Sequence, residues 1–205
     1  MDASRLRVAV LVSGSGTNLQ ALLDRARRPD AAYEVTVVIS DRPGVLGLRR
    51  AAAAGVPAVV VDWKEHASRA AFTDEICRVA ADHGVGALVL AGFMRILAPG
   101  ATERYPDRII NVHPALLPAF PGAHAVAQAI AYGVKLSGAT VHFVDEEVDH
   151  GPIIAQEAVP VDPGDGEAEL HARIQAVEHR LLPDVVQAFA EGKITVEGRI
   201  VRWEK

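Results

Sequence analysis

Two polar side chains at the end of an apolar run have the types needed to move protons and stabilise an anion. Asn111 and His113 close the segment 108–113 and lie two residues apart, so in a strand they face the same side. An imidazole can transfer protons while a neighbouring carboxamide donates to a developing oxyanion. The alternative is a buried, hydrogen-bonded histidine beside an asparagine that caps a turn. The position at a strand end, where open α/β sheets bind ligands, favours the chemical interpretation.

An acidic turn between two later apolar runs offers a carboxylate that can pair with His113. Four of the five residues 145–149 are acidic, and such clusters are usually solvent-exposed. The alternative is that Asp149 turns inward, favours the imidazolium form of His113 and selects its tautomer. Spacing along the chain leaves both alternatives open. A catalytic metal held by His142, Asp149 and His150 is not favoured, because no H-x-x-x-H or H-E-x-x-H pattern is present.

A glycine-rich loop, residues 13–18 with the sequence SGSGTN, follows the first apolar run. Glycines let backbone N–H groups approach an anion, and the N-terminus of the next helix adds a favourable dipole, which suits a phosphate. The loop lacks the third glycine of a dinucleotide fingerprint, where Leu19 stands, and the Gly-Lys-Ser/Thr ending of a Walker A loop. The alternative is a tight turn in which Thr17 is the helix N-cap.

The segment 92–97, with the sequence GFMRIL, follows another apolar run directly. A glycine, a flexible methionine and two aliphatic residues at a strand end can line an apolar slot for a flat ring. The alternative, which this segment alone favours, is ordinary core that continues into a helix.

These four segments need secondary structure that brings them to one place. Short β-branched runs alternate with alanine- and leucine-rich stretches over residues 1–110. Strands are expected over 7–12, 35–40, 58–61, 87–91 and 108–112, and helices over 18–28, 45–54 and 68–81. This alternation predicts βαβ units, an open and mostly parallel twisted sheet, and right-handed crossovers that place helices on both faces.

The second half of the chain predicts an antiparallel portion of the sheet. Strands are expected over 138–144 and 153–161, followed by a helix over 167–190 that Pro183 kinks and a terminal hairpin over 193–203. No repeat or linker interrupts the sequence. An α/β fold in a single domain, residues 1–205, is therefore expected.

Composition and charge limit the classes of protein to which the chain can belong. Its 205 residues are 50% hydrophobic and carry a formal net charge of −5, which excludes disorder as the main state and provides no global basic field for a nucleic acid. The single cysteine, Cys77, excludes an intramolecular disulfide and Cys-based zinc sites. No apolar stretch is long enough to span a membrane and no signal peptide is recognised, so a cytoplasmic location is expected.

Four motifs together resemble the phosphoribosylglycinamide formyltransferase family, the folate-dependent glycinamide ribonucleotide transformylases. The motifs are SGSGTNLQ at 13–20, AGFMRIL at 91–97, NVHPALLP at 111–118 and DHGP at 149–152. They occur in the family's order and spacing, and the similarity extends from about Arg7 to the long final helix, whereas the C-terminal hairpin looks shorter and more divergent. The resemblance implies a Rossmann-like formyltransferase fold with a phosphate-binding half, residues 1–110, and a catalytic, folate-binding half, residues 111–205.

The resemblance also implies which residues act. The implied catalytic set is Asn111, His113 and Asp149. The implied ribonucleotide-binding set is Gly16, Thr17 and Asn18 at the phosphate and Glu178 near the glycinamide or ribose. The residues implied to border the folate are Arg69, Met94, Arg95, Ile96, Leu97, Asn111, Asp145, Glu146, Glu147, Val148 and Asp149.

The implied reaction transfers the formyl group of the co-substrate 10-formyltetrahydrofolate to the amine of 5'-phosphoribosylglycinamide in de novo purine synthesis. The amine attacks the formyl carbon, Asn111 and protonated His113 donate to the tetrahedral oxyanion, and His113 or a water held by Asp149 carries the proton to N10. Neither a metal nor a covalent intermediate is needed. The implied partners are these small molecules rather than a nucleic acid or a membrane, and the chain is expected to be a monomer or a homodimer.

Two positions depart from the family's pattern. His150 stands where glycine is frequent, so the turn at Asp149 is expected to be less free to adopt a positive φ. Ser15 stands where asparagine is frequent, but it keeps a side-chain donor, so phosphate binding is expected to survive.

Three other functions share parts of this pattern. A methionyl-tRNA formyltransferase has a similar core, an additional C-terminal domain and a tRNA partner, which the net charge of −5 does not favour. A formyltetrahydrofolate hydrolase shares the catalytic trio, usually has an N-terminal regulatory domain and releases formate without an amine acceptor. A non-enzymatic nucleotide-binding module would explain the glycine loop but not Asn111, His113 and Asp149 together.

Overall fold

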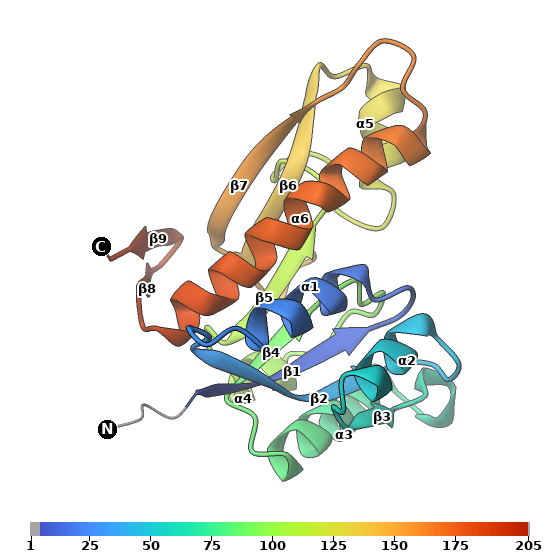
Figure 1. The fold of residues 1–205 in the computed structure, drawn as a ribbon. Helices are drawn as coiled ribbons and strands as arrows, with labels where there is room; N and C mark the ends of the chain where they lie inside the picture. The colour runs from blue at the N-terminus through green and yellow to red at the C-terminus, as the bar shows by residue number, and fades with distance from the viewer. Residues whose placement is uncertain (1–4, 205) are drawn as a thin grey trace.

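A seven-stranded sheet with the order β3-β2-β1-β4-β5-β6-β7 forms the centre of the protein (Figure 1). The computed structural model describes residues 5–204. Residues 1–4 lie outside the described part, and the expectation that the chain has no signal peptide rests partly on them. The first five strands along the chain run parallel, β6 is antiparallel to β5, and β7 is antiparallel to β6. The predicted mostly parallel sheet with an antiparallel C-terminal portion is therefore confirmed. The strands are β1 Leu6–Val12, β2 Tyr33–Ser40, β3 Ala58–Val60, β4 Ala87–Leu90, β5 Ile109–His113, β6 Leu136–Phe143 and β7 Ile153–Pro160.

Helices connect these strands, and a separate hairpin follows the last helix. The helices are α1 Thr17–Ala26, α2 Leu46–Ala53, the short 3-10 helix η1 Trp63–Glu65, α3 Arg69–Asp82, α4 Gly100–Arg104, α5 Ala125–Tyr132 and α6 Glu167–Ala190. The predicted terminal hairpin is present as β8 Ile194–Glu197 and β9 Ile200–Trp203. Three short helices, η1, α4 and α5, were not expected from the sequence. The helix α5 has no side-chain N-cap, and its Val126 packs against Leu170 and Ile174 of α6, so a distant part of the chain stabilises it.

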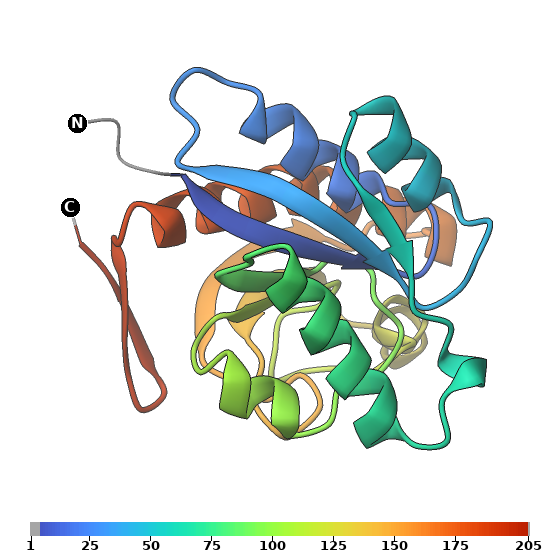
Figure 2. The ribbon, with the colours of Figure 1, turned by 90° about the horizontal axis from the view of Figure 1, so that it is seen from below.

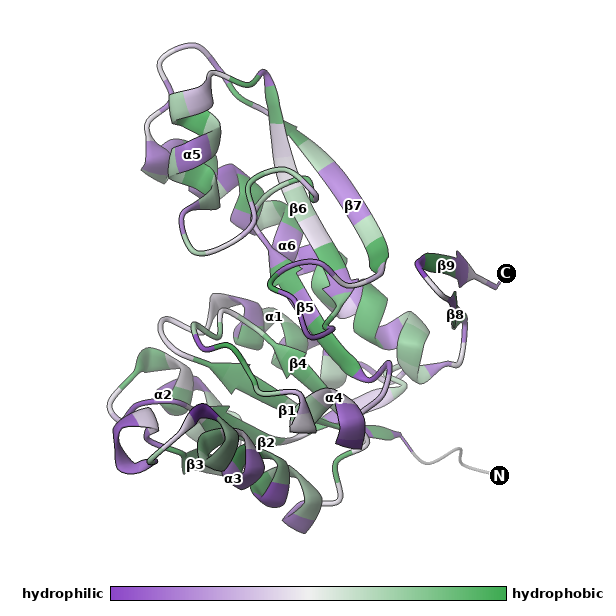
Figure 3. Cartoon of the chain, turned by 180° about the vertical axis from the view of Figure 1, so that it is seen from behind, coloured by the Kyte–Doolittle hydropathy of each residue, from purple (hydrophilic) through white to green (hydrophobic). Residues whose placement is uncertain are grey.

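The alternation of side chains along β1 explains why helices cover both faces of the sheet. Val8, Val10 and Val12 belong to a core cluster with α1, α2 and the C-terminal part of α6, whereas Ala9 and Leu11 pack with α3 and α4. Successive residues of a strand point to opposite faces, so a strand buried on both sides must be apolar throughout. Figure 2 shows the two layers of helices with the sheet between them, and Figure 3 shows that the central strands are hydrophobic over most of their length.

The connections reverse direction between β1 and β4, which are neighbours in the sheet. From β1 the chain passes outward to β2 and β3, and from β4 it passes the other way to β5. Ligands of open α/β sheets bind at such a switch point, beyond the carboxyl ends of the strands. The two loops that diverge there are joined, because the Ser13 N–H donates to the Gly92 carbonyl (3.1 Å) and the Met94 N–H donates to Ser13 Oγ (2.8 Å).

The long helix α6 begins and ends at the predicted residues and continues through Pro183. Its predicted buried stripe is present at Leu170, Ile174, Val177 and Leu182, whereas Leu181 is only partly buried. Among the described helices, none is both long and apolar enough to cross a membrane. Cys77 is buried in α3, and this burial raises the pKa of its thiol, as expected for an inert core residue.

Candidate active site

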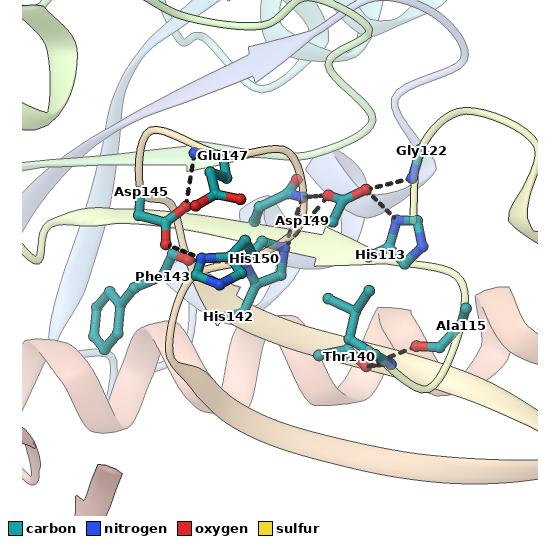
Figure 4. A network of polar contacts seen from close by, with 12 residues as sticks. His113, Ala115, Gly122, Thr140, His142, Phe143, Asp145, Glu147, Asp149 and His150 are labelled. Carbon is teal, nitrogen blue, oxygen red and sulfur yellow. Dashed lines mark hydrogen bonds and ion pairs between the residues drawn. The ribbon is translucent and has the colours of Figure 1, made fainter. Parts of the chain in front are cut away.

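Asp149 joins the two polar residues of β5 into one group. Its Oδ2 lies 3.2 Å from Nδ1 of His113 and accepts a 2.7 Å hydrogen bond from the Gly122 N–H, while its Oδ1 accepts a 3.3 Å bond from Nδ2 of Asn111 (Figure 4). Asp149 therefore turns inward rather than into solvent. The carboxylate, imidazole and amide come from the loop after β6 and from the end of β5, which are brought together by the antiparallel pairing of these strands.

The inward direction of Asp149 depends on its own backbone. Asp149 has a φ of 52°, in the left-handed region that only a few non-glycine residues adopt, aspartate among the more tolerant. The turn at Asp149 thus adopts a positive φ although His150 follows it, so the restriction expected from the missing glycine is not observed. Gly151 allows the chain to pass close to β6, because a Cβ there would lie 1.9 Å from the Phe143 carbonyl oxygen.

Both ring nitrogens of His113 face acceptors. Nδ1 lies 3.2 Å from Asp149 Oδ2, and Nε2 lies 2.8 Å from the carbonyl oxygen of Phe120. A neutral imidazole donates from one nitrogen only, whereas an imidazolium donates from both. The ring is buried, 4% exposed, where an unsatisfied contact is costly, so the two contacts fix its orientation at the end of β5.

His142 completes the group, although the sequence suggested it only as a metal ligand. Its Nδ1 lies 2.7 Å from the Phe143 carbonyl oxygen, so this nitrogen carries a proton. Nε2 lies 3.1 Å from Asn111 Nδ2 and 3.6 Å from Asp149 Oδ1. Asn111 and His142 are cross-strand partners of β5 and β6, a relationship that no spacing along the chain reveals. The part of the chain that the structure describes contains no group of three or more His, Cys, Asp or Glu arranged for a metal ion.

The charge of Asp149 follows from opposing effects. Burial raises the pKa of its carboxyl, but the contacts with His142, with the Gly122 N–H and with His113 lower it further than burial raises it. The net pKa lies below the ordinary value of an aspartate, so this carboxyl is ionised at neutral pH.

A cavity of about 350 Å³ opens beside this group. Its walls come from the segment after β4, from the end of β5 and from the loop after β6. Ten of the predicted folate residues line it, namely Met94, Arg95, Ile96, Leu97, Asn111, Asp145, Glu146, Glu147, Val148 and Asp149. The eleventh, Arg69, does not, because it begins α3 away from this wall. Met94 and Ile96 are 60% and 52% exposed at the cavity, so they offer apolar surface to a ligand there.

The side chain of Arg95 binds other groups of the protein. Its Nε donates to Asp41 Oδ2 (2.9 Å), and its guanidinium lies 5.2 Å from the centre of the Trp63 ring. Asp41 is 1% exposed; burial raises the pKa of its carboxyl, but hydrogen bonds from Ser13, Arg95 and Arg42 bring it below the ordinary value. Arg95 thus ties the loop after β4 to the end of β2, and only its remaining surface faces the cavity.

The glycine loop after β1 packs against a second helix, α2. Gly16, with φ 69°, is the N-cap of α1, so Thr17 is the first helical residue rather than the cap. A Cβ on Gly16 would lie 2.7 Å from Cα of Gly47 in α2, so only glycine fits. Arg50 of the same helix donates from Nε to the Ser15 carbonyl (2.9 Å). Sequence reasoning missed this cation, since nothing local indicates that α2 lies against the loop.

Asn18 and Glu178 meet at the far side of this loop. Nδ2 of Asn18 donates to Oε2 of Glu178 over 2.9 Å, and both residues are buried. The resemblance had implied that both face the ribonucleotide, and they do lie together, at the start of α1 and in the middle of α6. Oδ1 of Asn18 is a buried acceptor for which the described residues supply no donor.

The comparisons with known proteins agree with this α/β fold. Residues 6–186 match the family described as Formyl transferase. The chain is 48% identical to a phosphoribosylglycinamide formyltransferase of Mycobacterium tuberculosis over 94% of this chain and 89% of that protein. The crystal structure of glycinamide ribonucleotide transformylase 1 from Symbiobacterium toebii superposes with a TM-score of 0.96 at 48% identity, covering 98% of this chain and 95% of that one.

The same similarity extends to larger proteins. The chain is 44% identical to the trifunctional purine biosynthetic protein adenosine-3 of Gallus gallus over 96% of its own length, and it spans 20% of the length of that protein. The family is thus shown by its profile and by relatives that the chain covers almost completely. The protein belongs to the formyl transferase family.

Proposed function

We propose that this protein transfers the formyl group of 10-formyltetrahydrofolate to the amine of 5'-phosphoribosylglycinamide, as a one-carbon transferase of purine synthesis. The observation that carries the proposal is the position of Asp149. It contacts Asn111 and approaches His113 at the wall of the cavity that ten of the expected folate residues line. The names of two relatives at 48% identity support the same reaction.

The glycine loop binds the ribonucleotide phosphate in this proposal. The N–H groups of Gly16, Thr17 and Asn18 lie at the N-terminus of α1, where the helix dipole favours an anion. Glu178 lies next to Asn18 and contacts the glycinamide or the ribose. The folate occupies the cavity, with its flat ring between the segment 92–97 and the loop 144–149.

The reaction proceeds by direct attack of the amine on the formyl carbon. The tetrahedral oxyanion receives hydrogen bonds from Asn111 and from protonated His113, and Asp149 stays ionised beside the imidazolium. The amide Nδ2 of Asn111 is already engaged by His142 and Asp149, so one of these bonds is exchanged for the bond to the oxyanion. The bond from the formyl carbon to N10 then breaks. The protonated His113 gives its proton to N10 and regains one from the amine, or a water held by Asp149 relays the proton between them.

Formyl transfer of this kind needs the folate as co-substrate and no metal. The partners in the proposal are two small molecules. The cytoplasmic location, the monomer or homodimer state and the division into the halves 1–110 and 111–205 stay predictions.

A spectrophotometric assay of 10-formyltetrahydrofolate tests the proposal. Loss of the formyl group is expected only when 5'-phosphoribosylglycinamide is present, with one N-formyl product for each folate consumed. Formate release at the same rate without the ribonucleotide would indicate a hydrolase and overturn the proposal. Formylation of methionyl-tRNA in place of the ribonucleotide would overturn it as well, and so would the absence of any turnover.

A further inference from the structure

The C-terminal hairpin lies against the strand that follows the catalytic loop (Figure 1). Trp203 Nε1 of β9 donates to the Ile154 carbonyl of β7 over 3.0 Å. Val196 and Val201 of the hairpin pack against the main core. The hairpin is therefore docked by a hydrogen bond and apolar contacts, and its turn has a fixed position relative to the loop 144–151.

Arg199, in the turn of this hairpin, contacts both the backbone and the side chain of His150. Its Nη2 donates to the carbonyl oxygen of His150 over 2.7 Å. Its Nη1 lies 3.4 Å from Nδ1 and 3.3 Å from Nε2 of the same residue. The guanidinium therefore restrains the position of the His150 ring as well as its backbone.

His150 passes this restraint to the other end of the loop. Its Nδ1 lies 2.7 Å from Oδ2 of Asp145, and Oδ1 of Asp145 accepts a 3.0 Å bond from the Glu147 N–H (Figure 4). Asp145 and Glu147 both line the cavity. Arg199, His150 and Asp145 thus form a continuous chain of contacts from the hairpin across the loop.

Asp149 lies in the loop that these contacts restrain, and its backbone conformation requires such restraint. Asp149 holds a positive φ, and a non-glycine residue persists in such a conformation only when its surroundings over-determine it. Gly122, His113 and Asn111 restrain its side chain. The bond from Arg199 to the His150 carbonyl restrains the backbone that follows it.

We propose that Arg199 is a positioning residue that holds the loop 144–150 in the conformation that receives the folate and directs Asp149 inward. The proposal rests on the proposed function, because the loop forms one wall of the folate cavity. The proposal gives the C-terminal hairpin a role in the reaction. This hairpin is the part of the chain that resembles the family least.

Arg199→Ala tests this assignment, with Arg202→Ala as the matched control. Arg202 lies on the same hairpin and pairs with Glu197 of that hairpin (2.6 Å), without reaching the loop. Loss of one charge-assisted hydrogen bond at an exposed site is expected to raise KM for the folate about 5-fold. KM for the ribonucleotide is expected to stay unchanged, Arg202→Ala to behave as wild type, and Arg199→Lys to restore part of the loss. Equal effects of Arg199→Ala and Arg202→Ala would overturn the proposal.

A double-mutant cycle separates positioning from general support. Arg199→Ala is expected to raise the folate KM by a smaller factor in the His150→Ala background than in wild type, because only the bond to the His150 carbonyl is left to lose. A factor as large as in wild type would show that the His150 side chain takes no part in the chain of contacts to Asp145 and would overturn the proposal.

Hydrogen exchange tests the positioning without any assumption about the substrate. Amides of residues 145–150 are expected to exchange faster in Arg199→Ala than in wild type or Arg202→Ala, while those of 92–97 stay unchanged. Unchanged exchange at 145–150 overturns the positioning proposal even when the formyl-transfer assay succeeds. Faster exchange in a protein without formyl transfer would leave the positioning intact and refute only the proposed function.

Discussion

The amide Nδ2 of Asn111 lies 3.1 Å from Nε2 of His142, its cross-strand partner on β6. Nε2 of His142 also lies 3.6 Å from Asp149 Oδ1, and Nδ1 is held by the Phe143 carbonyl, so the ring contacts both the Asn111 amide and the carboxylate and restrains their relative orientation. We therefore expect His142 to be a positioning residue for the amide that donates to the oxyanion in the proposed reaction.

Replacing His142 by phenylalanine is expected to lower kcat about 10-fold to 100-fold, because the Asn111 amide loses the polar contact that orients it. KM for the ribonucleotide is expected to change little. The control is His83→Ala, since Nδ1 of His83 also lies 2.8 Å from a backbone carbonyl, that of Val79, but at the end of α3. Steady-state kinetics with both substrates measures the split. A wild-type kcat for His142→Phe would contradict this role.

Asn111 and His113 are expected to act as one unit with Asp149. Asn111→Ala and His113→Ala should each lower kcat about 10²-fold to 10³-fold. The double variant is expected to lose far less than the product of the single losses, because the remaining group cannot act alone. Thermal unfolding of each variant verifies that the fold is kept. Near-full turnover of His113→Ala would show that the proton-transfer assignment is wrong.

The lowered pKa of Asp149 predicts a pH dependence of stability. Burial raises this pKa, and the contacts with His142, Gly122 and His113 lower it to a net value below the ordinary one. The folded state thus favours the carboxylate, so the stabilisation is complete above the unfolded-state value of about 3.9 and is lost as the pH falls through the lower folded-state pKa.

The difference in unfolding free energy between wild type and Asp149→Asn is therefore expected to be constant near neutral pH and to shrink below about pH 4. Urea unfolding at several pH values measures it. A difference that grows as the pH falls would mean that the folded state favours the protonated carboxyl.

Gly16 is expected to tolerate no side chain. Its φ of 69° and the 2.7 Å approach of a Cβ to Gly47 Cα would strain the loop in Gly16→Val. KM for the ribonucleotide should rise about 10-fold or more, and KM for the folate much less. Gly14→Ala in the same loop is the matched control, since a Cβ there meets nothing within 4 Å. Equal effects of Gly16→Val on both substrates would count against phosphate binding at this loop.

Local patterns of the sequence were sufficient for most of the fold. The alternation of apolar runs and helical stretches predicted every strand of the large sheet to within a few residues, and α6 at its observed bounds. The period of two in a strand also placed Asn111 and His113 on one face. These features depend on residues a few positions apart, whose relation the backbone geometry sets directly.

The site itself required contacts between distant segments. The inward turn of Asp149, the contact of His142 with Asn111 and the pairing of Arg95 with Asp41 depend on strand order, on register and on a positive φ. The short helix α5 likewise depends on packing against α6. The residues present in the chain thus define which chemistry is available and on which elements it lies. The distances and orientations of these residues follow from the packing of the whole core. Each of these contacts joins two segments that are far apart in the sequence, and local backbone geometry does not determine how close such segments come in space.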